Sequence, residues 1–224
     1  MKSFSKPFSR EYFMKKKEKI KESYNTTADF YNSRYRNIQY EKYARMLNGM
    51  RLSGRILDLG SGTGLLSGFL DKEVIDVDFS INMLKKSKNK NRIFADAENL
   101  PFKNGMFDIV LSFTLIQNLP DFSRRNANIY YGKHFQCFPN ISGKAPGFSV
   151  KSPESSGKLR SFPEIKVFKE VRRILKSNSL FILTILRKKY DGNVKKELEK
   201  DFFILKEVDC GEDIGFICRV KRHK

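Results

Sequence analysis

Apolar residues along the chain gather in short runs of two kinds. Runs rich in branched side chains predict buried strands, and runs with apolar residues three and four positions apart predict helices. The predicted strands cover 55–59, 74–78, 92–95, 107–113 and 180–186, and the predicted helices between them cover 65–70, 81–88 and 162–176. Because strand and helix alternate, the pattern predicts an α/β protein with a doubly wound parallel sheet.

The two ends of the chain extend this pattern. Residues 11–49 carry aromatic and aliphatic residues at helical spacing, and Asn25, Thr26 and Thr27 interrupt the run. This predicts an amphipathic pair of helices, with the polar triplet supplying the N-cap of the second. At the other end, 202–208 and 214–220 are extended runs joined by a turn, which predicts a hairpin at the sheet edge.

Residues 122–163 break the alternation. This segment of 42 residues holds 7 Ser, 4 Gly and 4 Pro, and it follows neither a helical nor a strand period. Loops longer than about 15 residues are uncommon in compact domains and are usually functional or disordered. We interpret 122–163 as an insertion after the fourth strand, either a lid over a substrate or an excursion without chemical role.

Composition adds a strong positive charge, with 44 Lys and Arg against 25 Asp and Glu, a net charge of +19. Counting by segment, residues 23–121 carry only +2, whereas 1–22, 122–162 and 163–190 carry +5, +6 and +6. A neutral core with basic attachments fits a polyanionic partner such as RNA, because Lys and Arg neutralise phosphates. The alternative is a lysine-rich composition that only keeps the protein in solution.

Several classes are disfavoured by what the chain lacks. No apolar run reaches the about 18 residues that span a bilayer, so we expect no membrane insertion. The three cysteines, Cys137, Cys210 and Cys218, lack paired spacing, which favours a reducing cytoplasm. With only His134 and His223, we expect no metal centre.

The first candidate ligand-binding residues lie in the turn after the first predicted strand. Gly60, Gly62 and Gly64 follow Asp58 there, and glycine lets a ligand approach the backbone at the start of a helix. Asp78 closes the second strand and Asp96 follows the third, so three carboxylates meet at one edge of the sheet. Two phosphates of a dinucleotide would be repelled there, whereas an adenosine bearing a cation would be tolerated. A plain tight turn and a helix N-cap are the alternatives for the glycines and for Asp78.

Four motifs carry a family resemblance. They are ILDLGSGTG at 56–64, VDFS at 77–80 with Met83 and Leu84, DAENLPF at 96–102 and FDIV at 107–110. Together they resemble class I S-adenosylmethionine-dependent methyltransferases, notably the type 11 subgroup similar to ubiquinone and menaquinone methyltransferases. The G-x-G-x-G spacing agrees, since nicotinamide enzymes favour glycine where Leu65 stands.

The resemblance implies a Rossmann-like, seven-stranded sheet with an antiparallel last strand and helices on both faces. It implies a helical cap over 1–50 and a methyltransferase domain over 51–224. It also implies how S-adenosylmethionine is held. Asp58 and the backbone of Gly60, Ser61, Gly62 and Gly64 would hold the methionine part, Asp78 the ribose hydroxyls, and Met83 would pack on adenine. Phe79 is implied as a further cofactor contact. Asp96 and Ala97 would bind the adenine edge, Ser112 would face the methyl end, and Tyr24 and Tyr31 would cover the cofactor.

The acceptor stays open at this point. After the fourth strand the chain has no Asn/Asp-Pro-Pro-Tyr/Phe motif and no Pro-Cys pair, which disfavours two routes of nucleobase methylation. Gln117, Arg124, Tyr130 and Tyr131 are the candidate substrate contacts, the last three in the insertion. We therefore expect a cytoplasmic methyltransferase for a small molecule, with an RNA methyltransferase and a non-catalytic cofactor-binding protein as alternatives.

Overall fold

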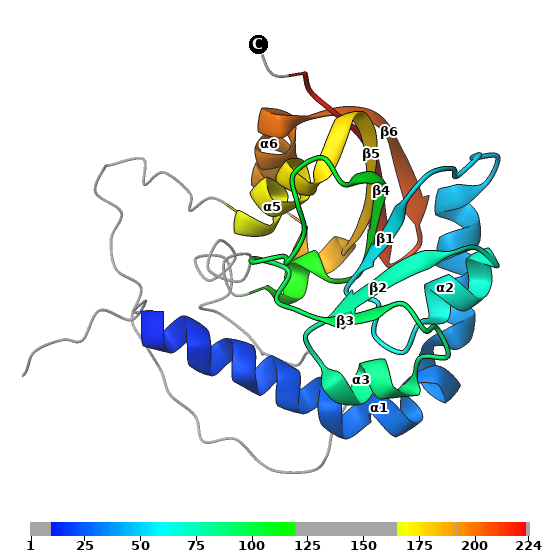
Figure 1. Cartoon of the computed structure of the whole chain (residues 1–224), viewed down its shortest axis with the longest axis vertical. Helices are drawn as coiled ribbons and strands as arrows, with labels where there is room; N and C mark the ends of the chain where they lie inside the picture. The colour runs from blue at the N-terminus through cyan, green and yellow to red at the C-terminus, as the bar shows by residue number, and fades with distance from the viewer. Residues whose placement is uncertain (1–9, 120–164, 191, 223–224) are drawn as a thin grey trace, which may run out of the picture.

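The computed structural model describes residues 10–119, 165–190 and 192–222, which form one sheet with helices on both sides (Figure 1). The sheet has seven strands in the order β3-β2-β1-β4-β5-β7-β6. They are β1 (Ile56–Leu59), β2 (Val74–Asp78), β3 (Arg92–Phe94), β4 (Phe107–Phe113), β5 (Leu175–Leu186), β6 (Phe202–Cys210) and β7 (Asp213–Val220). The seven-stranded α/β sheet implied by the resemblance is confirmed.

The strand order reverses at β1. Leu57 pairs with Ile75 of β2 on one side and with Val110 of β4 on the other, both in parallel. The connections after β1 and β4 therefore leave the sheet in opposite directions and open a crevice at the carboxyl ends of these strands, where α/β proteins bind their ligands.

Alternating strand residues build a separate core on each face. Leu57, Leu59 and Val110 point into the core covered by α5 (Lys166–Ile174) and α6 (Gly192–Asp201). Ile56 and Ile109 point into the other core, covered by α1 (Arg10–Leu47) and α2 (Leu65–Leu70). Helices on both faces are thus confirmed, and α3 (Ile81–Lys86) lies beside β2.

The N-terminal segment is one helix, α1, so the prediction of a helix pair is wrong. Thr26 and Thr27 donate their hydroxyl hydrogens to the carbonyl of Ser23, each at 2.9 Å, and do not cap a second helix. Such bonds keep polar side chains within a helix and often bend it. Figure 1 shows α1 changing direction along its length, so that its two halves serve different parts of the domain.

The terminal hairpin is confirmed, and it inserts β7 between β5 and β6. β7 runs antiparallel to both neighbours, which leaves β6 at the edge. β5 begins at Leu175, earlier than predicted, because Asn178 takes a positive φ of 69° and lets the strand pass through a short irregularity. Asparagine tolerates that conformation better than most residues, which suits it to this turn.

Helix α6 was not predicted, because its sequence is mostly charged and buries only Val194, Glu197 and Leu198. The insertion 122–163 lies outside the described residues, and so do Cys137 and His134. Within the described part, no helix is long and apolar enough to cross a membrane, and no cluster of His, Cys, Asp and Glu side chains could hold a metal ion.

Candidate functional site

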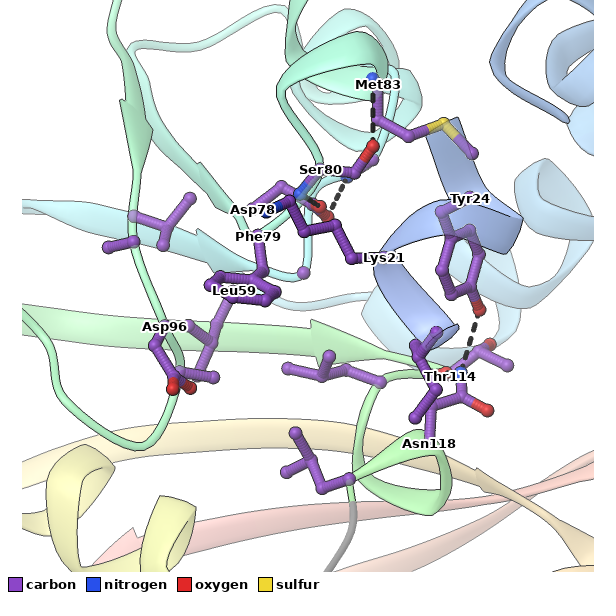
Figure 2. A pocket seen from close by; sticks show the side chains of 18 of the residues that line it. Lys21, Tyr24, Leu59, Asp78, Phe79, Ser80, Met83, Asp96, Thr114 and Asn118 are labelled. Carbon is purple, nitrogen blue, oxygen red and sulfur yellow. Dashed lines mark hydrogen bonds between the residues drawn. The ribbon is translucent and has the colours of Figure 1, made fainter. Parts of the chain in front are cut away.

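A cleft of about 890 Å³, its mouth included, lies at the crevice where the strand order reverses. Its walls come from the first half of α1, the turn after β1, the ends of β2 and β3, and the segment after β4. Figure 2 shows side chains from these elements facing one another across the cleft. Gly60, Gly62, Asp78 and Asp96, predicted from separate motifs, all line it.

The glycine turn folds back against β2. The amide groups of Gly60 and Ser61 donate to the carbonyl of Val77, at 2.8 and 3.0 Å. A Cβ on Gly62 would meet nothing within 4 Å, so this position faces open space, whereas a Cβ on Gly64 would lie 2.1 Å from Ser87 Oγ. Gly62 thus leaves room beside the backbone where a ligand could approach, whereas glycine at position 64 is required by packing inside the protein.

Asp78 holds this turn to the end of β2. Its Oδ2 accepts from the Gly62 amide at 2.9 Å and its Oδ1 from the Ser80 amide at 2.7 Å. Burial raises the pKa of Asp78, and the backbone donors oppose that rise only in part. Each carboxylate oxygen has a second lone pair, so Asp78 can still accept hydrogen bonds from a ligand diol.

Asp58 is the most isolated acid of the site. Its side chain is buried, with 3% exposure, and no described residue donates a hydrogen bond to its carboxylate. Burial first, and the charges of Asp76 and Asp78 second, raise its pKa well above the ordinary value. A buried carboxylate without donors is costly, which is the pattern expected where a cationic or N–H-bearing ligand completes the site.

At the far end of the cleft, Asp96 is engaged by a cation from α1. Lys17 Nζ lies 2.5 Å from Asp96 Oδ2 and also pairs with Glu98. Burial lowers the pKa of Lys17, but the bonds to both carboxylates outweigh it and raise that pKa overall. Asp96 Oδ1 accepts from the amide of Glu98 at 3.0 Å. Lys17 therefore occupies the carboxylate that was predicted to bind adenine.

The ring of Phe79 lines the wall between Asp78 and Asp96, supported from behind by Phe94. Phe79 stacks on Phe94, with ring centroids 5.6 Å apart, and the ammonium of Lys21 lies 5.2 Å from the centre of the Phe79 ring. Met83 lines the cleft beside them and is 1% exposed. This wall offers flat apolar surfaces to an aromatic ligand such as a purine.

Polar contacts anchor α1 across the cleft. The side-chain amide of Asn118 donates to the Tyr24 hydroxyl at 2.8 Å (Figure 2). Ser80 Oγ donates to Asn25 Oδ1 at 2.6 Å. Thr63 donates its hydroxyl hydrogen to Asn32. Tyr24 and Tyr31 line the cleft as predicted, and burial chiefly raises the pKa of Tyr31 to about 12. The first half of α1 thus forms one wall of the site.

Other predicted residues lie off the cleft wall. Ser112 is fully buried inside β4, and Phe113 and Thr114 line the cleft in its place. Ser61, Gln117 and Asp58 are also buried and do not line the cleft, although Asp58 lies directly before the lining residue Leu59, and Gly64 is outside the lining too. The sequence reasoning missed Lys17, Lys21, Thr114 and Asn118, because neither helical spacing nor a family motif marks them. Arg124, Tyr130 and Tyr131 lie outside the described residues.

Known proteins share both the sequence motifs and the fold. Residues 57–130 match the profile of a methyltransferase domain family. The uncharacterized protein MJ1252 of Methanocaldococcus jannaschii is 36% identical over 121 residues, covering 50% of this chain and 46% of that protein. A demethylmenaquinone methyltransferase of Staphylococcus saprophyticus is 30% identical over 126 residues, covering 48% of this chain and 54% of that protein.

Among solved structures, an S-adenosylmethionine-dependent methyltransferase of Thermotoga maritima superposes with a TM-score of 0.58 at 16% identity, covering 90% of this chain and all of that one. At this identity the likeness concerns the fold. This chain spans about half, or less, of the length of the curated relatives that it matches.

The fold, the cleft and these matches agree with the resemblance drawn from the motifs. Residues 57–130 thus match a methyltransferase domain, and the described part of the chain has the fold of solved S-adenosylmethionine-dependent methyltransferases.

Proposed function

We propose that this domain transfers the methyl group of S-adenosylmethionine to a small-molecule acceptor at the β4 side of the cleft. The observation that carries the proposal is the buried carboxylate of Asp58, which has no hydrogen-bond donor among the described residues. Asp58 comes directly before the cleft residues Leu59 and Gly60. A ligand with an ammonium and a sulfonium supplies the charge that this acid lacks.

Different described residues would bind different parts of S-adenosylmethionine along the cleft. Asp58 and the Gly62 backbone would hold the methionine part, Asp78 the ribose hydroxyls, and the wall of Phe79 and Met83 the adenine. When bound, S-adenosylmethionine supplies a methyl carbon that is electrophilic because sulfur carries a positive charge. The protein then has to align the acceptor and exclude water, which we assign to the segment after β4 and to Tyr24.

The β4 side of the cleft offers little base chemistry. Its described lining consists of Phe113, Thr114, Leu115, Asn118 and Leu119, and none of these side chains titrates near neutral pH. Tyr31 keeps its proton, because its pKa is raised to about 12. We therefore infer an acceptor atom that already has an available lone pair, such as an amine or an ionised oxygen.

The same lining favours a small molecule over RNA. Lys17 and Lys21 are the cations among the described cleft residues, and both lie at the wall of Phe79 and Asp96. A phosphate backbone would need cations on the acceptor side.

The net charge of +19 favours RNA as the second candidate. Binding to RNA that weakens steeply between 50 and 200 mM salt, on the order of 10³-fold or more, would support it. A cytoplasmic location stays a prediction from the cysteine pattern.

Transfer of label tests the proposal. The protein is incubated with methyl-labelled S-adenosylmethionine and fractionated cell extract, and label is counted in metabolite, RNA and protein fractions. We expect label in the metabolite fraction. Label in RNA would replace the small molecule by the second candidate, and cofactor binding without label in any fraction would indicate a non-catalytic cofactor-binding protein.

A further inference from the structure

Thr114, the first residue after β4, has an unusual backbone. Its φ is +62°, in the left-handed region that β-branched residues rarely adopt. Thr114 lines the cleft between Phe113 and Leu115. A strained conformation at a cleft wall persists only where the surroundings hold it in place.

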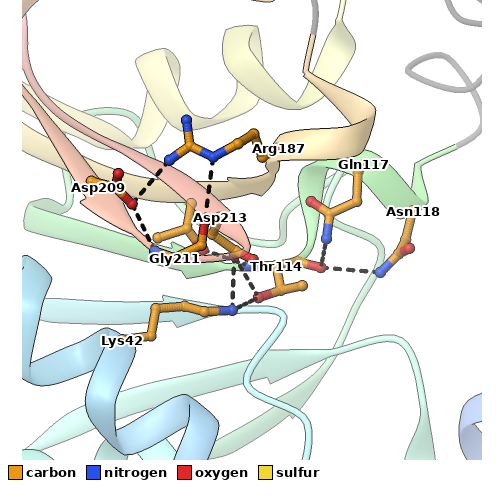
Figure 3. A network of polar contacts seen from close by, with 9 residues as sticks. Lys42, Thr114, Gln117, Asn118, Arg187, Asp209, Gly211 and Asp213 are labelled. Atoms are coloured by element: carbon orange, nitrogen blue, oxygen red, sulfur yellow. Dashed lines mark hydrogen bonds and ion pairs between the residues drawn. The ribbon is translucent and has the colours of Figure 1, made fainter.

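A buried ion pair holds the Thr114 hydroxyl. Lys42 Nζ of α1 lies 2.7 Å from Asp213 Oδ2 of β7, and the side chains are 5% and 1% exposed. Thr114 Oγ1 accepts from Lys42 Nζ at 2.7 Å and donates to Asp213 Oδ2 at 3.3 Å. Figure 3 shows the hydroxyl in contact with both charged groups, which also contact each other. The Thr114 amide is also engaged, with Thr184 Oγ1 of β5 at 3.2 Å.

The hairpin turn fixes the acid of this pair. Arg187, from the short helix η2 (Arg187–Lys189), pairs with Asp209 at 2.9 Å and donates through Nε to the Gly211 carbonyl at 3.3 Å. The Gly211 amide donates to Asp209 at 2.8 Å (Figure 3). These contacts of Arg187 and Asp209 fix the turn, and they thereby fix the position of Asp213, which begins β7 just after it.

The carbonyl of Thr114 orients the cleft wall that follows. It accepts from Gln117 Nε2 at 2.8 Å and from Asn118 Nδ2 at 3.0 Å, both in the short helix η1 (Ile116–Asn118). Asn118 also donates to the Tyr24 hydroxyl of α1. One residue thus connects the buried ion pair, the wall after β4 and the part of α1 that covers the cleft.

We propose that Thr114 is a positioning residue for methyl transfer, and that Lys42 and Asp213 act through its hydroxyl to hold the acceptor-side wall, residues 113–119. This inference rests on the proposed function. The adenosine side of the cleft is built by β1, β2 and β3, so a displaced wall after β4 alters the placement of the acceptor and leaves cofactor binding intact. Misplacement by about 1 Å can slow a reaction about 10²-fold.

Three substitutions at Thr114 separate the hydroxyl from the backbone. Thr114→Val keeps the branched shape and removes the hydroxyl, and Thr114→Ser keeps the hydroxyl. Thr114→Gly relieves the backbone strain but has no hydroxyl. The full chain and its variants are compared in the label-transfer assay with methyl-labelled S-adenosylmethionine, and calorimetry with S-adenosylhomocysteine measures the affinity of the cofactor side. Thr26→Val, at an exposed position of α1, is the matched control.

We expect Thr114→Val and Thr114→Gly to slow label transfer about tenfold to a hundredfold. Thr114→Ser and Thr26→Val should transfer label at close to the wild-type rate, and all variants should bind S-adenosylhomocysteine with similar affinity. A role limited to folding would not produce this separation, because loss of folding lowers binding and transfer together.

Two results would overturn the inference. Wild-type rates in Thr114→Gly would mean that the backbone conformation alone matters, and wild-type rates in Thr114→Val would remove any role for the hydroxyl. If the wild-type protein itself transfers no label, the proposed function fails. If wild type transfers label and the Thr114 variants match its rate, only this inference fails, so the two failures are distinguishable. Lys42→Met should reproduce the loss seen in Thr114→Val, whereas Lys176→Met, which breaks the exposed ion pair with Asp108, should not. Because Lys42→Met can prevent folding, the Thr114 variants decide the question.

Discussion

Replacing Asp58 by Asn tests whether this acid is kept for the cofactor at the expense of stability. The side chain is 3% exposed and, among the described residues, has no hydrogen-bond donor. Asn has the same shape without the charge, so Asp58→Asn removes the burial penalty with little change in packing. The substitution should therefore stabilise the ligand-free protein and weaken its binding of S-adenosylmethionine.

The pH dependence of stability follows from the raised pKa of Asp58. An acid whose folded-state pKa is raised contributes stability that is full below its unfolded pKa, about 3.9, and is lost as the pH rises through the folded value. Asp58→Asn has no such loss. The stability difference should accordingly be small near pH 4 and grow with pH, and each gain of about 1 kcal/mol raises the melting temperature by about 2–4 °C in a chain of this size.

The binding loss follows from the bond that the ligand would make. A hydrogen bond to a charged group contributes about 1.5–3 kcal/mol, so Asp58→Asn should weaken S-adenosylmethionine binding about 10-fold to 150-fold. Binding of a cationic ligand should also lower the pKa of Asp58, because it favours the carboxylate, and so release a proton at pH values between the ligand-free and ligand-bound pKa. Calorimetry in buffers of different ionisation enthalpy measures both quantities, and thermal melts from pH 4 to 9 measure stability. A variant that binds as tightly as wild type, with melting curves that shift equally at every pH, would refute this reasoning.

Three further outcomes concern the same cleft. Asp78→Ala should weaken cofactor binding by at least about 1 kcal/mol, because it removes both the ligand contact and the bond to the Gly62 amide; unchanged affinity in calorimetry would exclude a ribose contact. Lys17→Met should tighten S-adenosylhomocysteine binding severalfold, because Lys17 no longer competes for Asp96; weaker binding would show instead that Lys17 closes the cleft. Gly64→Ala should lower the unfolding free energy by about 1–3 kcal/mol, since φ is +73° and the added Cβ meets Ser87; a chemical denaturation curve that matches wild type would contradict this.

Local patterns were sufficient to predict the sheet, because each buried strand has its own apolar run. β2 and β4 have the predicted bounds, and the alternation of strand and helix implied their parallel pairing. The single helix α1 was missed since the polar triplet at 25–27 looks like an interruption in sequence. In the structure Thr26 bonds within the helix, and Asn25 turns to Ser80, a residue distant in the chain.

Residues of the site could be predicted from the sequence where they belong to a motif with a known chemical role. Asp58, Asp78 and the glycines belong to such motifs, but the partners of Asp96 do not. Lys17 lies 79 residues earlier in the chain than Asp96, and Lys42 meets Asp213 at the other end of the sequence. Contacts of this kind depend on how α1 packs across the finished sheet, which no local period records. Gly64 shows a different limit. It belongs to the glycine motif, but the structure requires glycine there because a Cβ would clash with Ser87, and the motif gives no sign of that.

The central claim is that carboxylates in this cleft bind an adenosine ligand that carries a positive charge. Calorimetry of the full chain with three ligands tests it most directly. We expect S-adenosylmethionine and S-adenosylhomocysteine to bind and NADH, which carries two phosphates, to give no heat of binding. Binding of NADH, with no response to either sulfur compound, would contradict the account.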